Sequence, residues 1–176
     1  MITLVPLTDA DRDAFVREEI ANYAEEQIRD AGWPRSEALA RARAELLPVI
    51  ERELAEARHW VWSARNAEGA TVGWLWVKPG DGPRSAFLYQ ITVADSFRRM
   101  GYGRAMLAAL EERLARDGID ELRLNVNVAN VPARRLYATA GYEQLDDDGR
   151  VCRLRKRLLV EPVRNACEDD PRLEEE

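Results

Sequence analysis

A chain of 176 residues is long enough for one domain, which at this size buries roughly 70% of the surface that its unfolded chain exposes. It has no apolar run near the roughly 20 residues that span a bilayer, and residues 1–9 lack the features of a secretory signal, so we expect a cytoplasmic protein that does not enter membranes. Most of the net charge of −6 lies in residues 161–176, which contain seven acidic residues and two arginines. Because the rest is nearly neutral, we expect a confined anionic ligand and no nucleic-acid partner.

The composition also sets the expected domain boundaries. We expect a single domain over residues 1–160 and an acidic, solvated tail over residues 161–176. The two cysteines, Cys152 in a predicted strand and Cys167 in the tail, have no Cys or His neighbours at metal-ligand spacing, so no metal site is expected. A disulfide between them is not expected in a reducing compartment.

The first part of the chain predicts a strand followed by two helices. Residues 2–7 read as a strand, and Thr8 is placed to cap a helix that Gly32 ends. A second helix is predicted from Ser36 to Ala57, and because Pro48 lies inside it, we expect a kink or break near residues 44–47. The apolar positions at helical spacing are Val16, Ile20, Tyr23 or Ala24, and Ile28, and then Leu39, Ala42, Leu46, Ile50 and Leu54.

The rest of the chain alternates strands and helices. Three strands are predicted at residues 59–65, 71–77 and 87–93, with a turn after the first and a Pro/Gly-rich loop after the second. A helix then runs toward Gly118, and a strand at 122–126 leads to a short helix at 130–142. Residues 143–145 and 151–158 predict a terminal hairpin. The predicted order is therefore strand, two helices, three strands, helix, strand, helix, two strands.

The most informative motif joins the predicted strand at 87–93 to the helix that follows it. It reads Arg98-Arg99-Met100-Gly101-Tyr102-Gly103-Arg104. Glycines ahead of a helix let the backbone approach a ligand closely, and the first helical N–H groups lack partners within the helix, so they can bind an anion. A dinucleotide fingerprint would need a third glycine at Met106, and a Walker loop would need Gly-Lys-Ser/Thr, so a nucleotide-dependent enzyme is disfavoured.

A second motif follows the predicted strand at 122–126. Residues 130–142 read N-x-x-A-x-x-L-Y and end in a Gly-aromatic pair. Together with the R-x-x-G-x-G pattern of Arg98, Gly101 and Gly103, this segment resembles the two signatures of the GNAT superfamily of N-acetyltransferases. The resemblance covers residues 61–158, while the first sixty residues match it only in outline.

The resemblance implies both a fold and an activity. The implied fold is α+β, a central mixed and mostly antiparallel sheet of about seven strands with about four helices, in which the central strands splay apart. The implied activity is the direct transfer of an acetyl group from acetyl-CoA, as co-substrate, to an amine of unknown identity. A homodimer is common among such proteins.

The family pattern also assigns cofactor-binding residues. The backbone N–H groups of Arg99, Met100, Gly101, Tyr102, Gly103 and Arg104 are assigned to the pyrophosphate, and the side chain of at least one of Arg98, Arg99 and Arg104 is expected to contact a phosphate. The free strand edge at Ile91 and Val93 is expected to pair with the amides of the pantetheine arm and to offer an oxyanion donor. Asn130 is a helix cap followed by proline, and in the family the matching residue also faces the cofactor.

Tyr137 is our predicted catalytic residue, because a phenol near the sulfur can protonate the departing thiolate. Many relatives carry a glutamate on the central strand near Thr92, but this chain has Gln90 and Thr92, so the base stays open. The candidate bases are Glu18, Glu19, Glu26, Tyr89 and the sole histidine, His59.

The acceptor site is expected on the first two helices and beside the central strands. We assign Tyr23, Glu19 and Asn125 to acceptor binding, Asn125 because it should point toward the cleft. The main hypothesis is an acetyl-CoA-dependent N-acetyltransferase. The alternative is a non-catalytic acyl-CoA-binding module of the same fold, which the replacement of a strand glutamate by Gln90 and Thr92 would explain.

Overall fold

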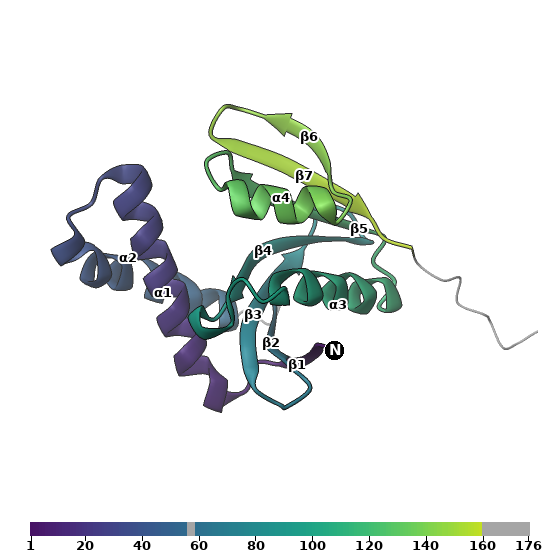
Figure 1. The fold of residues 1–176 in the computed structure, drawn as a ribbon, viewed down its shortest axis with the longest axis horizontal. Helices are drawn as coiled ribbons and strands as arrows, with labels where there is room; N and C mark the ends of the chain where they lie inside the picture. The colour runs from purple at the N-terminus through teal and green to yellow at the C-terminus, as the bar shows by residue number, and fades with distance from the viewer. Residues whose placement is uncertain (56–58, 160–176) are drawn as a thin grey trace, which may run out of the picture.

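The computed structural model describes residues 1–55 and 59–159, and the acidic tail with Cys167 lies outside them (Figure 1). Its elements follow the predicted order: β1 (Thr3–Pro6), α1 (Asp9–Ala31), α2 (Arg35–Ala55), β2 (Trp60–Arg65), β3 (Thr71–Pro79), β4 (Ser85–Val93), a short 3₁₀ turn (Asp95–Phe97), α3 (Tyr102–Arg116), β5 (Glu121–Asn127), α4 (Val131–Thr139), β6 (Glu143–Asp147) and β7 (Val151–Arg157). Among these helices, none combines the length and apolar character needed to cross a membrane.

The strands form one seven-stranded sheet in the order β1-β2-β3-β4-β5-β7-β6. All neighbours are antiparallel except β4 and β5, which are parallel and pair only from Ser85–Leu88 to Glu121–Leu124. Beyond Leu88, β4 pairs only with β3, and beyond Leu124, β5 pairs only with β7. The predicted mixed, mostly antiparallel sheet with splayed central strands is therefore confirmed.

A bulge marks the point where β4 leaves β5. Trp76 of β3 faces Gln90 and Val77 faces Leu88, which leaves Tyr89 without an opposite residue. An extra residue of this kind bends its strand and increases its twist. The bulge thus supports the divergence of β4 from β5.

The two faces of the sheet carry separate apolar clusters. Leu75 and Val77 of β3 pack with α3 and α4, whereas the alternate residues Trp74 and Trp76 pack with Phe15 of α1 and with α2. Figure 1 shows α1 and α2 lying together, apart from α4 and the β6–β7 hairpin. Between these two groups, the divergent ends of β4 and β5 have no strand to fill the space.

The start of α2 differs from the prediction, and of the kink or break expected near Pro48, a break does not occur. The helix begins at Arg35 rather than after a Ser36 cap, since the Pro34 carbonyl accepts hydrogen bonds from the N–H groups of Glu37 and Ala38, both at 3.0 Å. It also continues through Pro48 without a break. Proline removes one backbone hydrogen bond, but packing of the flanking turns against α1 keeps the helix continuous.

One residue of the predicted inward face of α2 was wrong. Leu39 is 59% exposed, and Ala38 is buried instead, where it packs with Ala42, predicted to be buried, against Ile20 and Ala24 of α1. Small side chains allow the two helix axes to approach closely, and a leucine at the contact would hold them apart. The tight α1–α2 pair then fixes α1 firmly relative to the sheet.

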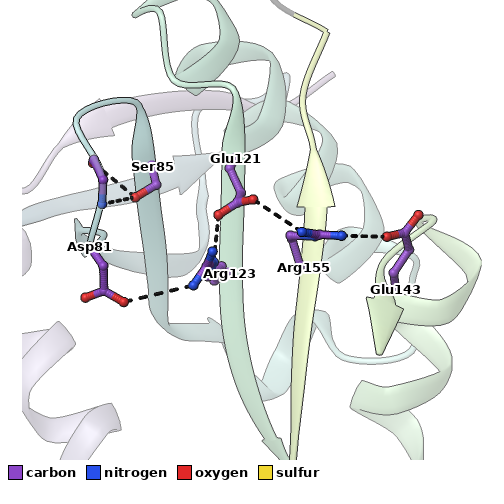
Figure 2. Close-up of polar contacts among 7 residues, drawn as sticks. Asp81, Ser85, Glu121, Arg123, Glu143 and Arg155 are labelled. Carbon is purple, nitrogen blue, oxygen red and sulfur yellow. Dashed lines mark hydrogen bonds and ion pairs between the residues drawn. The ribbon is translucent and has the colours of Figure 1, made fainter. Parts of the chain in front are cut away.

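A chain of ion pairs fastens β5 to its neighbours at the end where β4 and β5 still pair (Figure 2). Asp81 in the loop before β4 contacts Arg123, which contacts Glu121 at 2.6 Å. Glu121 contacts Arg155 of β7 at 3.8 Å, and Arg155 contacts Glu143 of β6 at 3.2 Å. The diverging strands β4 and β5 form a fork, which is closed at the end where Ser85–Leu88 pair with Glu121–Leu124. The ion pairs lie at this closed end and link the strands there, so the opposite end stays open.

Candidate active site

Two connected hollows occupy the fork between β4 and β5. The inner cleft, of about 330 Å³, lies between the diverging strands and is lined by residues that include Tyr89, Asp30, Asn125, Asn127 and Tyr137. The outer cleft, of about 710 Å³, lies over the turn before α3 and is lined by residues that include Asn22, Thr92, Arg98, Gly101 and Arg104. Both are lined by Glu26, Arg29, Gln90, Ile91, Val93, Gly103, Asn130, Ala133 and Leu136, so they form one continuous site.

The turn at residues 98–104 presents a row of backbone N–H groups to the outer cleft. Gly101 has φ +83° and precedes α3, which begins at Tyr102, while Arg99 adopts φ +61°, a region that non-glycine residues rarely enter. The N–H groups of Tyr102, Gly103 and Arg104 belong to the first turn of the helix, where no helical carbonyl is available. A Cβ atom at Gly101 would meet nothing within 4 Å, so the space beside this glycine is open to a ligand.

The three arginines of the turn differ in their contacts. Arg98 is engaged by Asp95 at 2.7 Å, donates from Nε to the Val93 carbonyl at 3.1 Å and donates to Asn22 Oδ1 at 3.4 Å. Arg99 and Arg104 also line the outer cleft, and within residues 1–55 and 59–159 they form no ion pair. Arg98 therefore braces the end of β4, while Arg99 and Arg104 are the guanidinium groups available to an anion. Met100 is 65% exposed and does not line either cleft.

Ile91 and Val93 lie on the edge of β4 that β5 leaves uncovered, and both line the two clefts. Asn130 caps α4 as expected, since its side chain accepts a hydrogen bond from the Ala133 N–H at 3.1 Å. It also lines both clefts, so the two roles expected of it are compatible. A Cβ atom at Gly103 would contact Val93 and Leu136 at ordinary distances, which shows how closely the turn approaches β4 and α4.

Tyr137 projects from α4 into the inner cleft. It is 5% exposed and packs edge-on against Tyr142, with 5.4 Å between ring centroids. Burial raises the pKa of its phenol to about 12. The group therefore remains protonated near neutral pH and is a proton donor rather than a base.

Helix α1 crosses the open end of the fork and contacts both strands. Near its middle, Glu19 accepts a hydrogen bond from the Thr92 hydroxyl of β4 at 2.8 Å. At its C-terminal end, Asp30 Oδ2 accepts from Asn127 Nδ2 of β5 at 3.1 Å. Glu26 lies between these two contacts along the helix and lines both clefts. The helix thus spans the gap and presents carboxylates toward it.

The structure brings together some of the expected acceptor residues but not all of them. Asn125 lines the inner cleft, as the sequence suggested. Glu19 lies beneath the site, 5% exposed and bonded to Thr92, and does not line either cleft. Tyr23 points to α2 instead, where its hydroxyl donates to Glu45 at 3.2 Å and its ring meets Trp33 edge-on. The geometry therefore does not support acceptor binding by Tyr23.

Sequence reasoning missed the polar residues that fix α1 over the fork. Asn22 of α1 contacts both Thr92 at 3.5 Å and Arg98, and Asp30 contacts Asn127. A signal was available, because Glu19, Asn22, Glu26 and Asp30 recur at helical spacing and lie on one side of the helix. A polar stripe beside the apolar one indicates that this side faces a hydrated cleft.

The arrangement suits a thioester of coenzyme A and a nucleophile. Free amides and two arginines can bind a diphosphate, an uncovered strand edge can pair with an amide-bearing arm, and a protonated tyrosine stands beside the fork. These features define an acyltransferase site.

Comparison with known proteins agrees with this geometry. The model of the acetyltransferase (GNAT) family matches residues 18–142. The uncharacterized N-acetyltransferase YycN of Bacillus subtilis is 29% identical over 147 residues, covering 82% of this chain and 94% of its own. Its crystal structure superposes with a TM-score of 0.72 over 84% of this chain and 95% of that one. The aminoglycoside N(6′)-acetyltransferase type 1 of Serratia marcescens is 30% identical over 138 residues, covering 74% of this chain and 89% of its own.

A more distant structure shares the fold. The PaiA N-acetyltransferase of Thermoplasma acidophilum, solved in complex with coenzyme A, has a TM-score of 0.67 at 18% identity over 89% of this chain and 99% of that one. The chain belongs to the GNAT acetyltransferase family. It is an N-acetyltransferase that uses acetyl-CoA as co-substrate, which confirms the prediction of an enzyme rather than a non-catalytic binding module.

Proposed function

We propose that this enzyme acetylates a small, polar primary amine in the inner cleft, with Tyr137 as the general acid. The observation that supports this most strongly is the fork itself, where an uncovered strand edge leads from a row of free amides to a protonated tyrosine. The proposal assigns each part of the site to one part of the reaction.

The turn and the strand edge are assigned to acetyl-CoA. In our assignment the N–H groups from residue 99 to residue 104 bind the pyrophosphate, aided by Arg99 and Arg104. Ile91 and Val93 offer main-chain groups to the pantetheine amides, and an N–H of this edge stabilises the negative charge that develops on the carbonyl oxygen. When bound, acetyl-CoA supplies an acetyl thioester whose carbon–sulfur bond breaks as the amine nitrogen bonds to the carbon.

Tyr137 is assigned to the departing sulfur. Its phenol remains protonated near neutral pH because burial raises its pKa to about 12. A thiolate would otherwise leave as an anion in a cleft with little water, so a positioned proton donor lowers the barrier. The edge-on contact with Tyr142 restricts the orientation of the ring.

The lining of the inner cleft supports a polar and cationic acceptor. Glu26 contributes a carboxylate from α1, and Asn125 contributes an amide from β5. Asp30, which lines the same cleft, is paired with Arg29 at 2.8 Å and accepts a hydrogen bond from Asn127. Carboxylates attract an ammonium group, and amides suit the hydroxyl or amino groups of the same molecule. The Serratia relative is named for the acetylation of an aminoglycoside, which has this combination of groups.

An acceptor panel tests this proposal. The purified protein is incubated with acetyl-CoA and with a monoamine, a polyamine or an aminoglycoside, and release of the free thiol is followed. We expect kcat/KM to be at least about tenfold higher for acceptors with several amino groups, because one additional favourable contact of about 1.4 kcal/mol changes the ratio tenfold. Equal rates for all three classes, or no thiol release with any of them, would contradict the proposal.

Two matched glycine substitutions test whether the turn binds the pyrophosphate. Gly101 and Gly118 both adopt positive φ, +83° and +82°, and at each of them a Cβ atom would meet nothing within 4 Å. A glutamate therefore strains both backbones alike, but only Gly101→Glu places a negative charge in the outer cleft. We expect calorimetry to show that Gly101→Glu loses coenzyme A binding and Gly118→Glu retains it. Equal affinities in the two variants would remove the turn from cofactor binding.

A further inference from the structure

The family glutamate expected on the central strand is missing here, yet an amine that arrives as an ammonium ion must lose a proton before it can attack. Five side chains were candidate bases from the sequence: Glu18, Glu19, Glu26, Tyr89 and His59. The structure separates them by position, and only Tyr89 and Glu26 line the inner cleft.

The other three candidates are placed where no acceptor can reach them from the clefts. His59 Nδ1 accepts from Trp76 Nε1 at 2.9 Å and its Nε2 contacts Glu53 at 3.0 Å, so both ring nitrogens are already engaged, outside the two clefts. Glu19 is 5% exposed and bonded to Thr92, and Glu18 lines neither cleft.

Tyr89 is excluded as the general base by the protonation state of its phenol. Burial raises the pKa of its phenol, and the carboxylates of Glu53 and Glu19 raise it further. A phenol with a raised pKa holds its proton at neutral pH and cannot accept another one. Among the five candidates this leaves Glu26.

The position of Glu26 follows from the two ends at which α1 is fastened. Thr92 on β4 holds the helix at Glu19, and Asn127 on β5 holds it at Asp30. Glu26 lies seven residues after the first contact and four before the second, which is about 10 Å and 6 Å along the axis. It therefore stands over the gap between the two strands, where it lines the inner and the outer cleft together.

We propose that Glu26, carried by α1 instead of the central strand, is the general base that takes the proton from the acceptor ammonium. This assignment rests on the proposed acetyl transfer to an amine. The nitrogen loses two protons in all. Glu26 takes the first proton and passes it to solvent. The nitrogen–carbon bond then forms and the carbon–sulfur bond breaks, while Tyr137 gives its proton to the departing thiolate. The second proton of the nitrogen goes to the Tyr137 oxygen and restores the phenol.

The charges around Glu26 are consistent with this role. Its pKa is raised chiefly by burial between the cleft walls, then lowered by Arg29 and raised by Asp30 on the same helix. The other ionisable groups that line the two clefts are Glu25 from α1, Tyr89 from β4, Tyr137 from α4, and Arg98, Arg99, Tyr102 and Arg104 from the turn and the start of α3. The carboxyl of Glu19 lies beneath the site and interacts electrostatically with Glu26. A carboxylate whose pKa lies above its usual range is a stronger base than one in water.

Glu26→Gln is the informative variant, and Glu51→Gln is its matched control. Glu51 is an exposed residue of α2 that lines neither cleft. Neither side chain belongs to an apolar cluster, so neither substitution disturbs the core. We expect Glu26→Gln to lower kcat by about 10²-fold at pH 7 with coenzyme A affinity unchanged, and Glu51→Gln to stay within about twofold of wild type.

The pH profile separates a base from a residue that only binds the acceptor. Without Glu26, only the amine that is already deprotonated can react, so kcat of Glu26→Gln should rise about tenfold per pH unit toward the acceptor's own pKa, and the deficit should shrink accordingly. An acceptor of low pKa, such as hydroxylamine, should likewise show a much smaller loss. A deficit that is constant across pH and across acceptors, or a kcat within about twofold of wild type at pH 7, would overturn the assignment. Absence of thiol release by the wild-type enzyme with every amine would instead refute the proposed function before any variant is compared.

Discussion

The buried carboxyl of Glu19 should make stability depend on pH in a way that can be calculated. Burial raises its pKa from 4.5 to about 7, Thr92 opposes this rise with a hydrogen bond, and Glu26 and Glu18 add to it. Between pH 4.5 and 7 the folded protein therefore binds more protons at Glu19 than the unfolded chain does. The free energy of unfolding consequently falls as pH rises through this window.

The size of the effect follows from the two pKa values. A rise from 4.5 to about 7 corresponds to about 3 kcal/mol, at about 1.4 kcal/mol for each pH unit. This cost is absent below pH 4.5 and complete above pH 7. Glu19→Gln removes the charge, keeps the volume and retains an amide oxygen that can accept the Thr92 hydrogen bond, so it removes the cost without opening a cavity.

Urea unfolding at about pH 4.5 and about pH 8 measures this difference. We expect Glu19→Gln to gain about 3 kcal/mol relative to wild type between the two pH values. Glu51→Gln, an exposed position on α2, reports the effect of the same substitution at the surface. A difference between Glu19→Gln and wild type that does not change with pH, or one that changes in the opposite direction, would refute the account of this carboxyl.

Two further substitutions test the catalytic acid and the packing of β4. Tyr137→Phe removes only a hydroxyl, and we expect kcat to fall by about 10²-fold with unchanged coenzyme A affinity, as measured by thiol release and calorimetry; an unchanged kcat would remove Tyr137 from catalysis. Gly73→Ala should destabilise the protein by about 1–3 kcal/mol in urea unfolding, because the new Cβ would overlap the Thr92 carbonyl oxygen, whereas Gly82→Ala meets only Ser85 at ordinary distances. Equal stabilities of these two variants would show that β4 can shift without cost.

Local signals in the sequence were sufficient for the order of the elements and for the local geometry of the turn before α3 and of the α4 cap. The turn at 98–104 and the cap at Asn130 are contiguous segments, so their residue types reveal the backbone geometry directly. The splayed strands followed from the family resemblance rather than from periodicity. The bulge at Tyr89, which accompanies the divergence, has no sequence mark that distinguishes it from an ordinary strand residue.

The acceptor side depended on tertiary packing and could not be predicted in the same way. The apolar stripe of α1 indicates which side faces inward, but not which strand each polar residue meets. Asp30 and Asn127 are 97 positions apart in the chain, and their contact is set by how α2 holds α1. Leu39 shows the same limit, because a leucine and an alanine at neighbouring positions both fit the helical pattern and only the close approach of α1 selects Ala38.

Helix α1 carries Glu26, the Asn22 contact with Arg98 and the Asp30 contact with Asn127, so a movement of this one helix changes all three. A small rotation of α1 would move Glu26, loosen the Asn22 contact that steadies Arg98, and open or close the Asp30–Asn127 bridge at the mouth of the fork. The position of the proposed base, the support of the turn before α3 and the width of the entrance would then change together.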